Sequence, residues 1–172
     1  KKGVTKYGRN AGLGFSCFAL RIHYTLDLWK AVGDGRQREC ENYISSFQST
    51  IDGENNLKRN AYIDPVIIQY LEKSERKRLY TDWLKRWLQS DNRKSVYGGG
   101  LRPHEKIIVG ETKQAIATLA EVGKTSSRPY GAFPRTEQDV QKYMAQFNWA
   151  QPWDAGGQTA ALAVFLCLEA PR

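Results

Sequence analysis

Apolar residues recur at helical spacing along most of the chain, and no segment shows the regular alternation of a half-buried strand. Glycine and proline separate the apolar blocks, as Gly33-Asp34-Gly35 does after the block over 13–32. The block from Ala160 to Leu168 is apolar nearly all round, which favours a helix in the middle of the fold. The sequence therefore predicts an all-α protein of about seven helices, joined as helical hairpins.

Local signals indicate where several of these helices begin and end. Asp64-Pro65 is typical of a helix start, with Asp as the N-cap and Pro at the first helical position. Thr136 and Asp139 resemble a capping box in which Asp replaces the usual Glu or Gln. Gly123 is expected just past the end of a helix over 105–122, because glycine readily adopts the left-handed conformation found there.

The 172 residues are enough for one domain with a sizeable core, so we expect a single all-α domain over 1–172. Because the chain begins with Lys rather than Met, it can equally be a piece of a longer protein. Its longest apolar run is well short of the roughly 18 residues that a membrane helix needs. Cys17 and Cys167 lie among apolar residues, which indicates reduced thiols and predicts a cytoplasmic protein.

The chain is basic, with 26 Lys and Arg against 18 Asp and Glu and a formal net charge of +8. This balance permits nucleic acid, anionic lipid or an acidic polymer as a partner and selects none of them. Positive charge concentrates over 73–94, beside a stripe containing Trp83 and Trp87. The candidate polyanion-binding residues there are Arg76, Lys77, Lys85 and Arg86. A solvated basic face over a buried aromatic stripe explains the same pattern, and we favour that interpretation.

Four short segments can be compared with known protein families: Gln48-Ser49-Thr50-Ile51-Asp52-Gly53, Tyr62-Ile63-Asp64-Pro65, 111–115 and 149–157. The first resembles the Q-x-x-x-D-G turn of α/α-toroid proteins, which include terpenoid cyclases and protein prenyltransferases, and the others are similar to helix starts in such proteins. The resemblance covers most of the chain and implies a partial α/α-toroid, with an irregular helical bundle as the alternative. It also implies that Gln48 caps neighbouring helix ends.

The number of helices has a consequence for the assembly of such a fold. A closed ring of paired helices needs about twelve, so about seven would make half of a longer protein, an open solenoid or one protomer of an assembly. Helical pairs that stack sideways leave apolar ends that need caps or neighbours. We therefore expect a protein partner or self-association.

The residues that carry out the best-known reactions of toroid enzymes are mostly absent from this sequence. No D-x-D-D cluster of the terpenoid cyclases is present, and neither of the two histidines, His23 and His104, stands next to a cysteine in sequence. A zinc site needs three or four placed ligands, so we expect no metal and no cofactor. Were the chain an enzyme acting on a carbohydrate or an isoprenoid, Glu111 or Asp154 would be its acid or base.

The segment over 148–158 is the one most like a ligand site. Trp149 and Trp153 can stack on sugar rings or isoprenoid chains, and Asp154 stands at a helix start whose N–H groups favour an anion. In the alternative interpretation, Asp154 only caps the helix and the tryptophans belong to the core. Three further residues complete the candidate ligand set, one in the same segment and two in the loop over 124–135: Gln158, Arg128 and Tyr130.

These observations lead to three hypotheses of function. We expect first an α/α-toroid-like domain that binds or scaffolds, as part of a larger protein or assembly. The second is an enzyme acting on a carbohydrate or isoprenoid, in which Arg128 or Tyr130 orients the substrate. The third, which we favour least, is a basic accessory protein that binds nucleic acid.

Overall fold

The computed structural model describes residues 10–49, 56–70, 73 and 103–169. Its named elements are α1 (Leu13–Thr25), η1 (Trp29–Ala31), α2 (Asp34–Ser45), η2 (Asn56–Lys58), α4 (Pro103–Glu121), α5 (Glu137–Ala145) and α6 (Pro152–Leu168). Residues 65–70 are also helical. Within this part of the chain there is no strand, so the predicted all-α class is confirmed, with about six helices. The toroid arrangement stays a prediction, and the helix expected around Trp83 lies outside the described residues.

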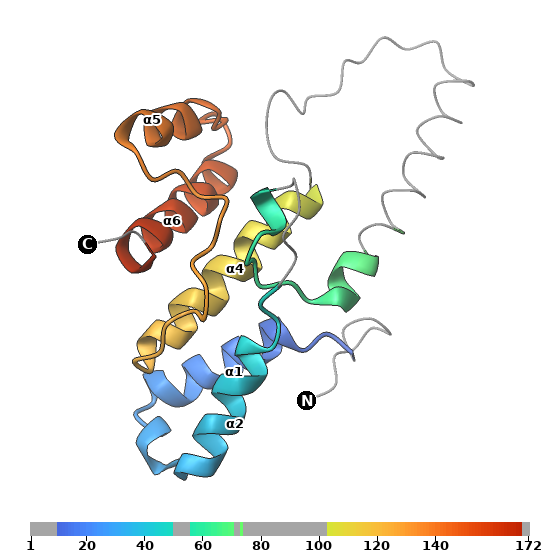
Figure 1. The fold of residues 1–172 in the computed structure, drawn as a ribbon, viewed down its shortest axis with the longest axis vertical. Coiled ribbons are helices and arrows are strands. Elements are labelled where there is room, and N and C mark those ends of the chain that lie inside the picture. The colour runs from blue at the N-terminus through green and yellow to red at the C-terminus, as the bar shows by residue number, and fades with distance from the viewer. Residues whose placement is uncertain (1–9, 50–55, 71–72, 74–102, 170–172) are drawn as a thin grey trace.

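The longest of the helices with described bounds, α4, occupies the middle of the molecule (Figure 1). It contacts α1, α2, η2 and α6, and it contributes Ile108, Ala115 and Leu119 to the core. The apolar sequence of α6 led us to expect that helix at the centre. Among the described elements α6 instead flanks α4, and it leaves Ala160 and Ala163 exposed.

The first helix ends earlier than its apolar pattern predicts, at Thr25 rather than near residue 32. Asp27 adopts a left-handed conformation, with φ of 53°. Its N–H donates to the carbonyl of Tyr24, and the N–H of Leu28 donates to the carbonyl of His23 at 2.8 Å. These two bonds form a Schellman motif, which closes a helix by satisfying its last carbonyls. Gly123 closes α4 in the same way, as predicted, with φ of 75°.

One buried carboxylate ties the start of α1 to a segment some fifty residues later. Asp64 is almost completely buried, and its Oδ2 accepts from the backbone N–H groups of Gly12 at 2.7 Å and Leu13 at 3.1 Å. Its Oδ1 accepts from Val66 N–H at 3.0 Å, which confirms the predicted N-cap at Asp64-Pro65. A single side chain thus caps two helices and fixes their starting points together.

A second connection joins three loops through the amide of Gln48. Its Nε2 donates to the carbonyls of Asn60 at 3.1 Å and Arg128 at 2.6 Å, while its Oε1 accepts from Arg128 N–H at 3.3 Å. The toroid resemblance implies that this residue caps helix ends. Here it bonds to loop carbonyls instead, and it holds the loop after α4 against the segment that precedes Asp64.

The burial of the cysteines differs in part from what the sequence predicts. All three are free thiols; Cys17 is buried as expected, whereas Cys40 and Cys167 are exposed. Cys167 lies on the side of α6 that faces away from the core, because α6 is not the central helix. A search of the described helices finds none that is both long and apolar enough to span a bilayer.

Candidate functional site

The α1 helix has two apolar faces, of which the fold buries only one. Leu13, Cys17 and Leu20 are at most 2% exposed and pack in the core. On the opposite side of the helix, Phe15, Phe18 and Ile22 are 48%, 58% and 57% exposed. The apolar block over 13–32 thus contains large side chains that the fold leaves exposed. A stripe of large apolar side chains on one helix face is typical of a contact surface.

Beside this stripe runs a groove of about 630 Å³ between α1, α4 and α6. Its floor is one face of α4, and Phe18 and Val164 stand on opposite sides of it. The groove is lined by Phe18, Arg21, Lys106, Ile107, Gly110, Glu111, Lys113, Gln114, Ala117, Ala160 and Val164. Most of its surface is apolar, whereas the charged groups come from Glu111 and from Arg21, Lys106 and Lys113.

Glu111, the first candidate acid or base, lies half-buried in this groove. Burial raises the pKa of its carboxyl from 4.5 to about 7, because the charged form loses solvation. The backbone N–H of Asp64 donates to Glu111 Oε2 at 3.3 Å and partly opposes that rise, while the nearby Asp64 carboxylate adds to it. A carboxyl with a pKa near neutrality can accept or donate a proton under physiological conditions.

Gly110 lies beside Glu111 in the middle of α4. A Cβ built on this residue would meet nothing within 4 Å, so the packing of the fold does not require glycine here. Glycine inside a helix costs roughly 0.5–1 kcal/mol relative to alanine. Because Gly110 has no side chain, the floor of the groove is lower at this position, and a ligand or another backbone can come close to α4.

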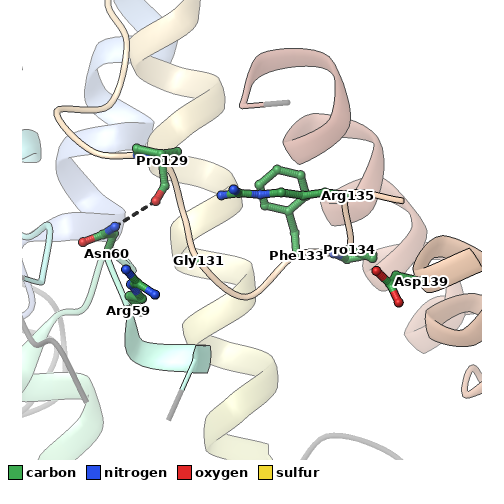
Figure 2. A pocket seen from close by; sticks show the side chains of 8 residues that line it. All are labelled: Arg59, Asn60, Pro129, Gly131, Phe133, Pro134, Arg135 and Asp139. Atoms are coloured by element: carbon green, nitrogen blue, oxygen red, sulfur yellow. Dashed lines mark hydrogen bonds between the residues drawn. The ribbon is translucent and has the colours of Figure 1, made fainter. Parts of the chain in front are cut away.

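A second depression, of about 370 Å³, lies near the start of α5 (Figure 2). It is lined by Arg59, Asn60, Pro129, Gly131, Phe133, Pro134, Arg135 and Asp139. The loop after α4 forms one wall, and the residues that follow η2 form the other. Sequence reasoning missed this pocket, because its two walls are seventy residues apart and neither contains a motif.

The tryptophans of the predicted ligand site are both exposed: Trp149 by 56% and Trp153 by 93%. Gln158 is half-buried, and the side chain of Asp154 lies outside the described set. The ring of Phe147 lies 5.6 Å from that of Trp149. Trp149, Trp153 and Gln158 lie near the start of α6, and none of them lines the groove or the pocket.

The two loop residues of the predicted set lie elsewhere. Tyr130 is buried, its hydroxyl donates to the carbonyl of Leu57 at 3.0 Å, and its ring lies 4.9 Å from that of Phe165. Since Phe165 is twelve residues beyond Trp153 on α6, Tyr130 is about 18 Å along the helix from that tryptophan. Arg128 is exposed, and its backbone is bound to Gln48.

The polyanion-binding candidates Arg76, Lys77, Lys85 and Arg86 fall outside the described residues. Across the described ones, no three His, Cys, Asp or Glu side chains are grouped so that they could hold a metal ion. One feature of the sequence indicates the groove. Apolar residues occur on all sides of α1, which predicts two contact faces rather than one.

Comparison of the chain with protein families, with curated proteins and with solved structures finds no match. The site must therefore be interpreted from its own geometry.

Proposed function

We propose that this chain is an α/α-toroid-like scaffold domain that binds an amphipathic helix of an acidic protein in the groove between α1, α4 and α6. The observation that carries the proposal is the second apolar face of α1, where Phe15, Phe18 and Ile22 remain about half exposed. Helix-in-groove recognition uses such faces, with anchors at i, i+3, i+4 and i+7.

The cost of leaving these side chains in water is large enough to drive binding. Each exposes on the order of 100 Å² of apolar surface, which corresponds to about 2.5 kcal/mol on complete burial. Three such side chains represent roughly 7 kcal/mol before the entropic cost of association is subtracted. A partner that covers the stripe and the adjacent groove can recover a substantial share of this free energy.

Charge decides which partner is favoured. Lys106 and Lys113 line the groove together with Arg21, whose Nε forms an ion pair with Glu121 at 3.1 Å. The whole chain carries a net charge of +8, so two copies repel one another. Acidic residues beside the apolar face of a partner helix would meet these cations. Charge complementarity therefore favours an acidic partner over a second copy of this chain.

Gly110 supports a helix as the occupant. Small residues at a helix contact allow two backbones to approach closely, and Ala117 and Ala160 line the same groove. Among the described residues, none comes within 4 Å of a Cβ built on Gly110. A helix lying on α4 would use that space and would bury Phe18 against its side.

An enzyme acting on a carbohydrate or isoprenoid is the second candidate, and Glu111 is the observation that favours it. A half-buried carboxyl with a pKa near 7 in an apolar groove suits a general acid or base. The binding function ranks first because it also accounts for the exposed stripe on α1. The nucleic-acid hypothesis rests on residues outside the described ones and stays a prediction.

A designed peptide tests the proposed docking. The probe is a fluorescent 15-residue helical peptide with leucine on one face and glutamate on the flanks, titrated into the full chain by fluorescence anisotropy. Lysine replaces glutamate in the matched peptide. We expect saturable binding of the acidic peptide and at least tenfold weaker binding of the basic one.

Two variants locate the binding surface. Phe18→Asp should weaken binding by roughly sixtyfold, since its side chain loses about 2.5 kcal/mol of apolar burial. Gly110→Leu should block the groove, whereas Gly35→Leu, on an exposed part of α2 with equal space for a side chain, should bind as the unmodified chain does. Equal binding of both peptides, or equal affinity of Gly110→Leu and Gly35→Leu, would contradict the proposal. Sedimentation as a stable dimer would assign the surface to self-association instead.

A further inference from the structure

The pocket near the start of α5 brings together two arginines from distant parts of the chain. Arg59 follows η2 and Arg135 immediately precedes the N-cap of α5, and both line one depression of about 370 Å³. Figure 2 shows them on either side of Gly131, with Asp139 at the other end of the pocket. Small-molecule sites commonly occupy about 300–1,000 Å³, so the pocket is large enough for a small ligand.

The position of the Arg135 guanidinium is fixed by its neighbours. Its Nη2 donates to the carbonyl of Tyr130 at 3.3 Å, and its Cζ lies 5.2 Å from the centre of the Phe133 ring. A cation over an aromatic face is attracted to the ring, which restricts the long side chain. A guanidinium has five N–H donors, so the bond to Tyr130 leaves further donors for a ligand.

The stem of Arg59 is held in place by Gly131. The carbonyl of Arg59 accepts from Gly131 N–H at 3.0 Å, and the Nδ2 of the neighbouring Asn60 donates to the carbonyl of Pro129 at 2.9 Å. A Cβ added at Gly131 would lie 3.0–3.1 Å from Cβ, Cγ and Cδ of Arg59. Glycine at 131 therefore lets the arginine stem pack directly on the loop after α4.

The acidic end of the pocket has its own partner. Thr136, the N-cap of α5, donates its hydroxyl to Asp139 Oδ2 at 2.7 Å, and its Oγ1 accepts from Asp139 N–H at 3.2 Å. This carboxylate is thus held at the first turn of α5, where it also favours the positive end of the helix dipole. The pocket consequently has a cationic end and an anionic end.

We propose that Arg59 and Arg135 bind the oxyanion of a small ligand, a phosphate or a carboxylate group, in this pocket. Arginine forks match the oxygens of both groups, and the two arginines line one pocket from segments whose backbones are hydrogen-bonded to each other. Asp139 disfavours an anion that fills the whole pocket, so the oxyanion occupies the arginine end. The site is separate from the groove on α4, and the proposal does not depend on the docking function.

Inorganic pyrophosphate and tricarballylate are the probes, titrated separately into the full chain at about 150 mM NaCl to suppress unspecific attraction to a basic protein. Binding is followed by calorimetry and by backbone amide shifts. We expect saturable binding of at least one probe, with amide shifts at Arg59, Asn60, Gly131 and Phe133. Tighter binding of pyrophosphate assigns a phosphate ligand, and tighter binding of tricarballylate assigns a carboxylate.

Conservative variants connect the binding to the two arginines. Arg135→Lys and Arg59→Lys keep the charge but lose the fork, and each should weaken the preferred probe about tenfold. Gly131→Ala displaces the Arg59 stem without changing the charge and should also weaken binding. Arg38→Lys, on the exposed side of α2, is the matched control. Absence of saturable binding by either probe, or an equal effect of Arg38→Lys and Arg135→Lys, would overturn the proposal.

Discussion

The carboxyl of Glu111 makes the stability of the fold depend on pH, and Glu111→Gln should remove that dependence. Burial raises the pKa of this group from 4.5 to about 7, and the Asp64 carboxylate contributes to the rise. Glutamine has nearly the same shape and cannot ionise. Its side-chain oxygen can still accept the N–H of Asp64, which donates to Glu111 Oε2 at 3.3 Å.

The direction of the effect follows from proton linkage. Below pH 4.5 the folded and unfolded chains both hold the Glu111 proton, and the carboxyl costs the fold nothing. Between pH 4.5 and 7 the unfolded chain releases this proton while the folded chain keeps it, so the free energy of unfolding falls as pH rises. Above pH 7 the Glu111 carboxyl is ionised in both states, and the folded chain bears the full desolvation cost of its charge.

The shift corresponds to at most about 3.5 kcal/mol, at about 1.4 kcal/mol per pKa unit. Because the groove opens Glu111 to solvent, screening reduces this cost to about 1–2 kcal/mol. Glu111→Gln should therefore nearly equal the unmodified chain in stability near pH 4, below the unfolded pKa of the carboxyl. It should exceed it by about 1–2 kcal/mol at pH 8, since the desolvated charge is gone.

Urea unfolding followed by circular dichroism at several pH values between about 4 and 8 measures this difference. All other titrating groups are shared by the two proteins, so their difference reports Glu111 alone. Glu39→Gln, on the exposed side of α2, is the matched control and should change stability by less than about 0.5 kcal/mol. Parallel curves for Glu111→Gln and the unmodified chain across this range would refute the reasoning.

Three further substitutions test other parts of the fold. Asp64→Ala leaves three buried or partly buried N–H groups without their acceptor and should lower the free energy of unfolding by about 3 kcal/mol or more, as measured by urea unfolding. Gly110→Ala should raise the melting temperature, because it removes roughly 0.5–1 kcal/mol of helix cost and adds no clash; a lower melting temperature would show that the fold does need glycine there. Gln48→Ala should accelerate amide exchange at Arg128, whose N–H donates to the Gln48 side chain; unchanged exchange at that amide would mean that other contacts hold the loop.

Helix boundaries could be predicted where a residue with a strong conformational preference marks the end of the helix. They were missed where no such residue is present. Gly123 and Asp27 both end a helix in the left-handed conformation, with the same pair of hydrogen bonds. Only the first was predicted, because glycine adopts that conformation at no steric cost and aspartate rarely does. Asp64 was predicted as an N-cap for its own helix, but its bonds to the start of α1 depend on packing between distant segments.

One residue of the candidate groove was singled out from the sequence, but the arrangement of the groove around it was not predicted. Glu111 was singled out for its carboxyl, and the structure places it in a groove. Gly110, next to it, was overlooked because glycine in a helix normally argues only against the helix. The pocket of Arg59 and Arg135 joins residues that no local pattern relates, so it emerges only when the loop after α4 packs on the segment after η2.

The capping of α1 by Asp64 also has a consequence for how the protein is made. The acceptor for Gly12 N–H lies 52 residues further along the chain. At about 5–20 residues per second, a ribosome needs about 3–10 s to reach it, and α4, against which α1 packs, emerges later still. During that interval the nascent α1 presents both of its apolar faces to the cell. We expect its early contacts to be with chaperones, until Asp64 and α4 take their place.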